Sequence, residues 1–425
     1  MPRVSAFERR ARQVRRVLRR FPVLQPLVNR VGTWVWRWHL SRKAQQDGGP
    51  ALPTRIELDP ASIERAVWRA EVLELAGSTQ QRNAVGLVRG GDWDERSFPL
   101  SELAVFAAVR RRVEEGVAWE ETAFHAEIEA ALDRGERPFK FRTHDDLERI
   151  FAKVDRLHEE IARDGYRDQE ELGTGRPWDE VVVAFDRHGR PLFVDGRHRL
   201  ALARALGLDS IPAIVAVRHE RWARLAGEVH AYAAERGGRA YQPYLHPDLA
   251  PIPSDQGHER FDLLLAALPI RSGTLLDLGA NSGYFSHRFE AAGFDCVAVE
   301  RSEKEAHFLT ALRDAAGRRF EILKGSLTEV PLPPRLDVVL ALNIFHHFLK
   351  TEAGYRELSD FLGRLETRFM LFESHLPDDP QMRQAAAHLE PDEFASRVAD
   401  LAGMERVERI GKADDGRPIF LLERT

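Results

Sequence analysis

The chain has 425 residues, of which 43% are hydrophobic and 30% charged, and its formal net charge is −5. This length and composition predict a globular, cytoplasmic protein of about two or three domains. They exclude a disulfide framework and a cysteine-built zinc site, because Cys296 is the only cysteine, and no metal site is predicted. No apolar run reaches the roughly 18 residues of a membrane-spanning helix.

Residues 1–50 form a basic N-terminal segment. Within 1–43 there are twelve Lys and Arg side chains and one acid, Glu8. Residues 5–20 have helical periodicity, with apolar positions on one side and arginines around the rest, and tryptophans follow at positions 34, 36 and 38. This pattern predicts either a helix packed on the chain's own surface or peripheral contact with the anionic inner face of a membrane. Nucleic acid is the less favoured partner.

Residues 51–143 are predicted to be mainly helical, after a strand over 54–58. The turn Gly91–Asp94 carries two carboxylates and fits either a site or a capped turn around a packed tryptophan. Residues 144–236 have the pattern of an α+β domain. Its predicted elements are a helix over 145–165, strands over 181–185, 191–194 and 214–217, and helices over 197–206 and 222–235. Residues 237–257 are rich in Gly, Pro and Tyr and are predicted to be a linker.

In the α+β domain a strand ends just before Asp195 and a turn opens the next helix. Gly196 permits close approach of a ligand, His198 and Arg199 supply donors, and a helix N-terminus favours an anion. This stretch resembles the ParB/sulfiredoxin-like nucleotide-binding fold, over about residues 145–218. The resemblance implies that these four residues bind a nucleotide, ATP or CTP with Mg²⁺. The alternative is a worn-down fold in which Asp195 and Arg199 form a structural pair.

Two activities of that family are disfavoured. Sulfiredoxins carry a catalytic cysteine in this turn, where this chain has Arg197. Chromosome-partitioning relatives continue into a helix-turn-helix region, where this chain has one helix over 222–235 and then the linker. Nucleotide binding remains, or phosphoryl transfer, for which Asp195 is the only candidate base.

From residue 258 to 425 apolar strands alternate with helices, which predicts βαβ units and a parallel sheet. The predicted strands cover 274–278, 296–300, 320–324, 338–342 and 369–373. A final pair over 407–410 and 418–422 predicts an antiparallel hairpin at one edge. The expected fold class is α/β, a Rossmann-like domain with a mostly parallel seven-stranded sheet.

The first of these strands runs into a glycine-containing loop within Leu275–Phe285. Gly279 and Gly283 let the backbone approach a ligand at the carboxyl end of the strand. Asp277 can accept from a ligand amine, and Glu300 ends the next strand, where it is placed for both hydroxyls of a ribose. This order of elements predicts a nucleoside site, and the glycine spacing differs from the G-x-G-x-x-G of NAD-binding domains.

The region resembles the class I S-adenosylmethionine-dependent methyltransferases over about residues 258–425. The resemblance implies that S-adenosylmethionine is the cofactor, with its methionine end along the glycine loop and its ribose at Glu300. Many members carry an adenine-contacting Asp where this chain has Ser326, so Ser326 or the backbone is expected to take that contact. The expected cofactor-binding residues are Asp277, Gly279, Asn281, Gly283, Glu300, Ser326 and Asn343.

In that family the loop after the fourth strand, here Leu342–Phe348, faces the methyl group to be transferred. It lacks the Pro-Pro-aromatic signature of amino-methyltransferases and the cysteine needed for cytosine-C5 chemistry. Methylation of an oxygen on a small molecule or glycan is therefore expected. A hydroxyl acceptor must lose a proton, and His346 or His347 is the candidate base. The alternative is that both histidines pack against or cap the following helix.

Two other functions remain open. A bifunctional kinase–methyltransferase that modifies a surface polysaccharide would pair similar modules, which is an analogy of architecture alone. A non-catalytic nucleotide-sensing or interaction protein is the alternative from a different class. The intact Gly279, Gly283 and Glu300 argue against that alternative.

Overall fold

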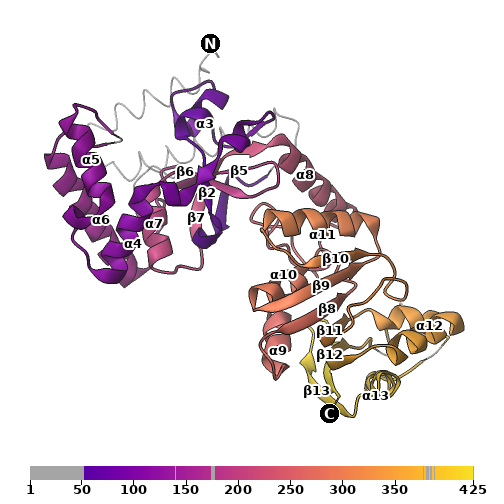
Figure 1. The fold of residues 1–425 in the computed structure, drawn as a ribbon. Helices are drawn as coiled ribbons and strands as arrows, with labels where there is room; N and C mark the ends of the chain where they lie inside the picture. The colour runs from indigo at the N-terminus through magenta and orange to yellow at the C-terminus, as the bar shows by residue number, and fades with distance from the viewer. Residues whose placement is uncertain are drawn as a thin grey trace. The chain divides into compact units, whose positions relative to one another are not determined.

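A computed structural model describes residues 52–424 except 139, 174–177, 377, 380, 381, 383, 384 and 387 (Figure 1). The basic segment 1–50, with its predicted helix and membrane contact, lies outside the described residues. The chain divides into two compact units, and the division falls between Gly227 and Glu228, inside helix α8 (Glu220–Glu235). Within the described residues, no helix is long and apolar enough to cross a bilayer.

The first unit is built on a mixed seven-stranded sheet. Its strand order is β1-β7-β5-β6-β2-β4, with β3 also paired to β7. The strands are β1 (Arg55–Leu58), β2 (Arg65–Ala66), β3 (Leu87–Arg89), β4 (Phe98–Pro99), β5 (Val181–Phe185), β6 (Pro191–Asp195) and β7 (Ile211–His219). Strands β5 and β6 form the predicted antiparallel hairpin, and β7 lies parallel to β5.

The helices of the first unit are α3 (Arg69–Leu75), α4 (Ala104–Glu115), α5 (Ala123–Asp133), α6 (Asp145–Asp164) and α7 (Arg197–Ala205). Helices α4 to α7 share a core of aliphatic and aromatic side chains. The predicted apolar stripe of α6 is buried, including Phe151 and Val154. Phe151 stacks on Trp119 with ring centroids 4.6 Å apart. The predicted helix over 145–165 is therefore confirmed.

The segment 51–143 is not a separate helical region. Strands β1 and β3 pair with β7, and β2 pairs with β6, so that the segment completes the sheet of residues 144–236. Strands β2 and β4 have only two residues each, too few for an alternating pattern to be recognised. The turn Gly91–Asp94 is structural, because the buried Asp94 accepts two hydrogen bonds from the Arg187 guanidinium, each 2.8 Å long.

The second unit contains the predicted mostly parallel seven-stranded sheet, in the order β10-β9-β8-β11-β12-β14-β13. Strands β8 to β12 are mutually parallel, and β14 runs antiparallel to both β12 and β13. The strands are β8 (Gly273–Leu278), β9 (Phe294–Glu300), β10 (Glu321–Lys324), β11 (Leu336–Leu342), β12 (Thr367–Glu373), β13 (Arg406–Lys412) and β14 (Pro418–Glu423). The chain order reverses beside β8, which opens a crevice at the carboxyl ends of the strands.

Helices cover both faces of this sheet (Figure 1). They are α9 (Glu259–Ala267), α10 (Tyr284–Ala291), α11 (Glu303–Ala315), α12 (Glu352–Gly363) and α13 (Pro391–Ala402), with a 3-10 helix η7 (Phe345–Lys350) after β11. One core layer contains Phe285 of α10 and Leu309 of α11, and the other contains Phe361 of α12 and Phe394 of α13. Because both faces are covered, the central strands are mostly apolar.

The predicted linker 237–257 is a folded part of the second unit. Leu249 and Ile252 are buried, and the backbone of Ala240 bridges to Ser254. The abundance of Gly and Pro in this stretch reflects its turns and not freedom of the chain. Its packing places Tyr241 beside the crevice described below.

Candidate cofactor cleft

A cleft of about 640 Å³ lies at the carboxyl ends of β8, β9, β10 and β11. This volume lies within the roughly 300–1,000 Å³ typical of small-molecule sites. The structure brings seven of the nine predicted residues of this unit to its lining: Gly279, Asn281, Glu300, Ser326, Asn343, His346 and His347. The other two, Asp277 and Gly283, are not among the described lining residues.

The loop between β8 and α10 turns through three residues with positive φ, namely Gly279 (70°), Asn281 (55°) and Gly283 (86°). The backbone N–H of Gly279 donates to the carbonyl of Val299 in β9 over 2.9 Å, which ties the loop to the neighbouring strand. A Cβ at Gly283 would lie 2.2 Å from Cδ1 of Leu309. The glycine at 283 is therefore required by packing against α11 as well as by its backbone conformation.

Asp277, near the end of β8, ties this strand to α10 beneath the glycine loop. Its carboxylate is buried and accepts a hydrogen bond of 2.7 Å from the hydroxyl of Ser286 in α10. Burial raises the pKa of Asp277 to about 6. Direct contact between this carboxylate and a ligand amine stays a prediction.

Glu300 is held rigidly at the end of β9. One carboxylate oxygen accepts from the backbone N–H of Asn281 over 2.8 Å, and the other accepts from that of Ser302 over 2.7 Å. Burial raises the pKa of Glu300 above its ordinary value. Each oxygen has a second lone pair, so the fixed carboxylate can also accept from the two hydroxyls of a ribose.

Ser326 lines the cleft from the loop after β10, and its hydroxyl lies 3.1 Å from that of Thr328. The backbone N–H of the preceding Gly325 donates to the carbonyl of Glu300 over 3.0 Å. This bond holds the ends of β9 and β10 together. Adenine contact through Ser326 stays a prediction.

Asn343 follows β11 with a φ of 54°. Its Nδ2 donates to the hydroxyl of Tyr241 over 2.9 Å, while its Oδ1 is buried and has no hydrogen-bond partner among the described residues. Tyr241 also lines the cleft. Tyr241 was not among the predicted site residues because it lies in the predicted linker, where the tyrosine content was the only available signal.

The two histidines differ in exposure. The side chain of His346 is buried and that of His347 is exposed, and their ring centroids are 4.0 Å apart. Nζ of Lys350 lies 3.2 Å from Nδ1 of His347. Partial desolvation by the surrounding side chains lowers the pKa of His347, and the charges of Lys350 and Arg301 lower it further, which favours the neutral ring.

In the first unit the predicted nucleotide-binding residues start helix α7. Gly196 has a φ of 92°, and a Cβ there would lie 2.9 Å from Cα of Val181. Arg199 pairs with Asp179 and Glu180, over 3.2 and 3.4 Å, so the alternative of a structural pair between residues 195 and 199 is wrong.

The remaining side chains of this turn also have partners or are buried. The carboxylate of Asp195 accepts from the N–H of Gly196 over 2.8 Å and lies 3.4 Å from Nε of Arg69. Burial lowers the pKa of His198 to about 3. Nucleotide binding at this turn stays a prediction.

The second unit has the strand order and crevice of a Rossmann-like methyltransferase. Residues 276–364 match the family described as "Methyltransferase domain". The C-terminal part of the chain is therefore a class I S-adenosylmethionine-dependent methyltransferase domain.

Several known proteins resemble this chain over part of its length. An "Uncharacterized methyltransferase" of Mycolicibacterium vanbaalenii is 36% identical over 75 residues, which is 17% of this chain and 29% of that protein. Monomeric WbdD is 22% identical with a TM-score of 0.34, covering 44% of this chain and 45% of its own. Magnesium protoporphyrin IX methyltransferase from Synechocystis PCC 6803, with bound SAM, is 16% identical with a TM-score of 0.31, covering 39% and 77%. The chain thus spans under a third of the curated relative.

Proposed function

We propose that this chain is an enzyme that transfers a methyl group from S-adenosylmethionine to a hydroxyl oxygen of a small molecule or a glycan. The observation that carries the proposal is the cleft where Asn281, Glu300 and Asn343 meet at the carboxyl ends of β8, β9 and β11. The fixed carboxylate of Glu300 is suited to accept from ribose hydroxyls, and the buried Oδ1 of Asn343 lacks a donor among the described residues. Both features fit a nucleoside that bears an amino-acid tail. When bound, S-adenosylmethionine supplies an electrophilic methyl group on a sulfonium.

The residues of the cleft have separate tasks in this proposal. Glu300 accepts the ribose hydroxyls, and the loop Gly279–Asn281 lets the backbone approach the cofactor closely. The assignment of an oxygen acceptor rests on the sequence after β11, which lacks the features of the nitrogen- and carbon-directed enzymes considered above. A hydroxyl becomes a competent nucleophile when a base takes its proton in the transition state.

We assign that base to His346 or His347. Both side chains line the cleft. A lysine ammonium can only donate, so the contact with Lys350 makes Nδ1 of His347 an acceptor and leaves the ring proton on Nε2. His347 can therefore act as a base only if Nδ1 exchanges Lys350 for the acceptor hydroxyl. His346 requires no such exchange with Lys350.

Methyl-labelled S-adenosylmethionine and a panel of hydroxylated small molecules and glycans test the proposal on the full chain. We expect labelled product together with an equal amount of S-adenosylhomocysteine, and turnover lowered by about 5–150-fold when Glu300→Ala is assayed at low cofactor concentration. Calorimetry should show that the wild-type chain binds S-adenosylhomocysteine. A correctly folded chain that binds neither cofactor form would overturn the proposal.

A further inference from the structure

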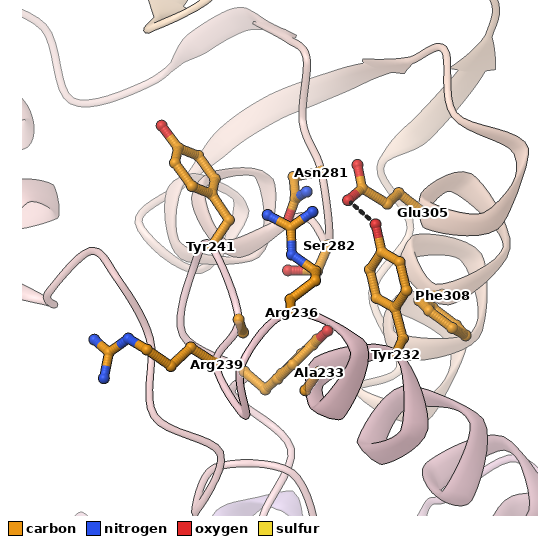
Figure 2. A pocket seen from close by; sticks show the side chains of 11 residues that line it. Tyr232, Ala233, Arg236, Arg239, Tyr241, Asn281, Ser282, Glu305 and Phe308 are labelled. Atoms are coloured by element: carbon orange, nitrogen blue, oxygen red, sulfur yellow. Dashed lines mark hydrogen bonds between the residues drawn. The ribbon is translucent and has the colours of Figure 1, made fainter. Parts of the chain in front are cut away.

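The segment between α8 and α9 contributes a cation to the cofactor cleft. Arg236, directly after α8, lines the cleft together with Tyr241, Asn281 and Glu305. The same four residues also line a smaller neighbouring pocket (Figure 2). Figure 2 shows the guanidinium of Arg236 extending toward Asn281 of the glycine loop, whereas Arg239 points away.

In the described part of the chain, Arg236 lacks the carboxylate partner that Arg239 and Arg260 each have. Arg239 pairs with Asp255 over 2.6 Å, and Arg260 pairs with Glu373 over 2.7 Å. Among the described residues, no carboxylate lies within ion-pair distance of Arg236, whose guanidinium carbon lies 5.6 Å from the ring centroid of Tyr232. The nearby Glu305 is already engaged, since it accepts a hydrogen bond of 2.8 Å from the Tyr232 hydroxyl (Figure 2).

The cleft also contains an acceptor that lacks a donor. In the structure Nδ2 of Asn343 donates to the Tyr241 hydroxyl, a group that can accept as well as donate. The buried Oδ1 of Asn343 is then left without a partner among the described residues, and an unsatisfied buried acceptor is costly unless a ligand donates to it. Tyr241, which bonds to Asn343, lines the same two pockets as Arg236.

We propose that Arg236 and Asn343 recognise the two charges of the cofactor's amino-acid tail, which deepens the proposed function and rests on it. Arg236 binds the α-carboxylate, for which a guanidinium is well suited, and Oδ1 of Asn343 accepts from the α-ammonium. Tyr241 is a positioning residue that holds the Asn343 amide. The segment after α8 is thus part of the cofactor site and not a connection to it.

The test compares two ligands on the full chain by calorimetry. S-adenosylhomocysteine carries both charges of the tail, and S-adenosyl-3-thiopropylamine is the same molecule without the carboxylate. In the wild-type chain we expect loss of the carboxylate to weaken binding about tenfold or more. In Arg236→Gln the two ligands should bind with nearly equal affinity, because the carboxylate has lost its partner.

Two matched variants make the result specific. Arg239→Gln should keep the wild-type ratio, since Arg239 points away from the glycine loop. Arg301→Gln should also keep it, because Arg301 lines the cleft next to Glu300, at the ribose end.

Tyr241→Phe tests the positioning role of Tyr241. It should weaken the binding of both ligands several-fold, because both retain the ammonium that Asn343 binds.

The outcomes separate this inference from the proposed function. A wild-type chain that binds both ligands equally, an unchanged ratio in Arg236→Gln, or a ratio that collapses only in Arg301→Gln would each overturn the role of Arg236. Unchanged binding by Tyr241→Phe would overturn the role of Tyr241. A wild-type chain that binds neither ligand would instead overturn the cofactor site itself.

Discussion

Each unit contains a strand, a glycine with positive φ and a helix that starts at the next residue. In the first unit β6 ends at Asp195, Gly196 has a φ of 92°, and α7 follows directly. In the second unit β8 ends at Leu278, and Gly283, with a φ of 86°, precedes α10. Only in the second unit do further loop residues lie between the strand and this glycine. Two of those residues, Gly279 and Asn281, line the cofactor cleft.

The two turns also differ in where their polar groups are satisfied. In the first unit Arg199 is paired with two acids of its own unit, and Asp195 accepts from the adjacent backbone. In the second unit Glu300 is fixed by backbone donors but retains free lone pairs, and Oδ1 of Asn343 has no partner among the described residues. A glycine before a helix therefore predicts a local backbone conformation and does not by itself indicate a ligand. A buried polar atom without a partner does not separate the two turns either, because Nε2 of His198 in the first turn is another such atom in the described part of the chain.

The largest expected effect is the loss of methyl transfer when a histidine of the cofactor cleft is replaced. One of His346→Ala and His347→Ala should lower methyl transfer by about 10²–10⁴-fold, because general bases contribute that much to catalysis. The measurement is label transfer to the acceptor found in the panel. Affinity for S-adenosylhomocysteine, measured on the same preparations, should be nearly unchanged in both variants. Full activity of both would show that the histidines are structural.

The next largest effect is on cofactor affinity, and it compares the acid at the end of β9, Glu300, with the acid at the end of β6, Asp195. Glu300→Ala should weaken S-adenosylmethionine binding by roughly 1–3 kcal/mol, because charge-assisted hydrogen bonds to the ribose are lost. Asp195→Ala, the matched change in the first unit, should leave that affinity unaltered. Calorimetry on both variants checks the pair, and equal affinity of Glu300→Ala and wild type would remove the ribose assignment.

Sequence patterns predicted the second unit well because its strands are long and buried on both faces. Each predicted strand from β8 to β14 is present, with ends shifted by at most a few residues. The glycine loop and Glu300 could be found because they are adjacent to these strands in sequence. Contacts between distant segments could not be found. The pairing of Tyr241 with Asn343 joins residues 102 positions apart, and the partners of Arg199 lie about 20 positions away.

A third prediction tests whether replacing Gly196 and replacing Gly283 lower the free energy of unfolding by similar amounts. Gly196→Ala and Gly283→Ala should each destabilise their own unit by about 1–3 kcal/mol, because both need positive φ and both added methyl groups meet close neighbours. Gly207→Ala is the control, since its φ is 62° and nothing lies within 4 Å of the added Cβ. Denaturant unfolding should rank Gly196→Ala as more destabilising than this control. Cofactor affinity should fall only in Gly283→Ala.

The smallest effect concerns a buried acid in each unit. Burial raises the pKa of Glu180 to about 7 and that of Asp277 to about 6. A raised carboxyl pKa means that the folded state binds more protons than the unfolded state between the two pKa values. The contribution of Glu180 to stability is therefore present at about pH 4.5 and is lost as the pH rises through about 7.

Glu180→Gln should accordingly flatten the pH dependence of the first unit's melting temperature across that window, by a few degrees at most. Asp179→Asn is the matched control, because Asp179 accepts from the same Arg199 but is exposed. The control should keep the wild-type slope, and the transition of the second unit should not respond to either change. If Asp179→Asn flattens the profile equally, the charge of Arg199 and not the burial of Glu180 determines the pH dependence.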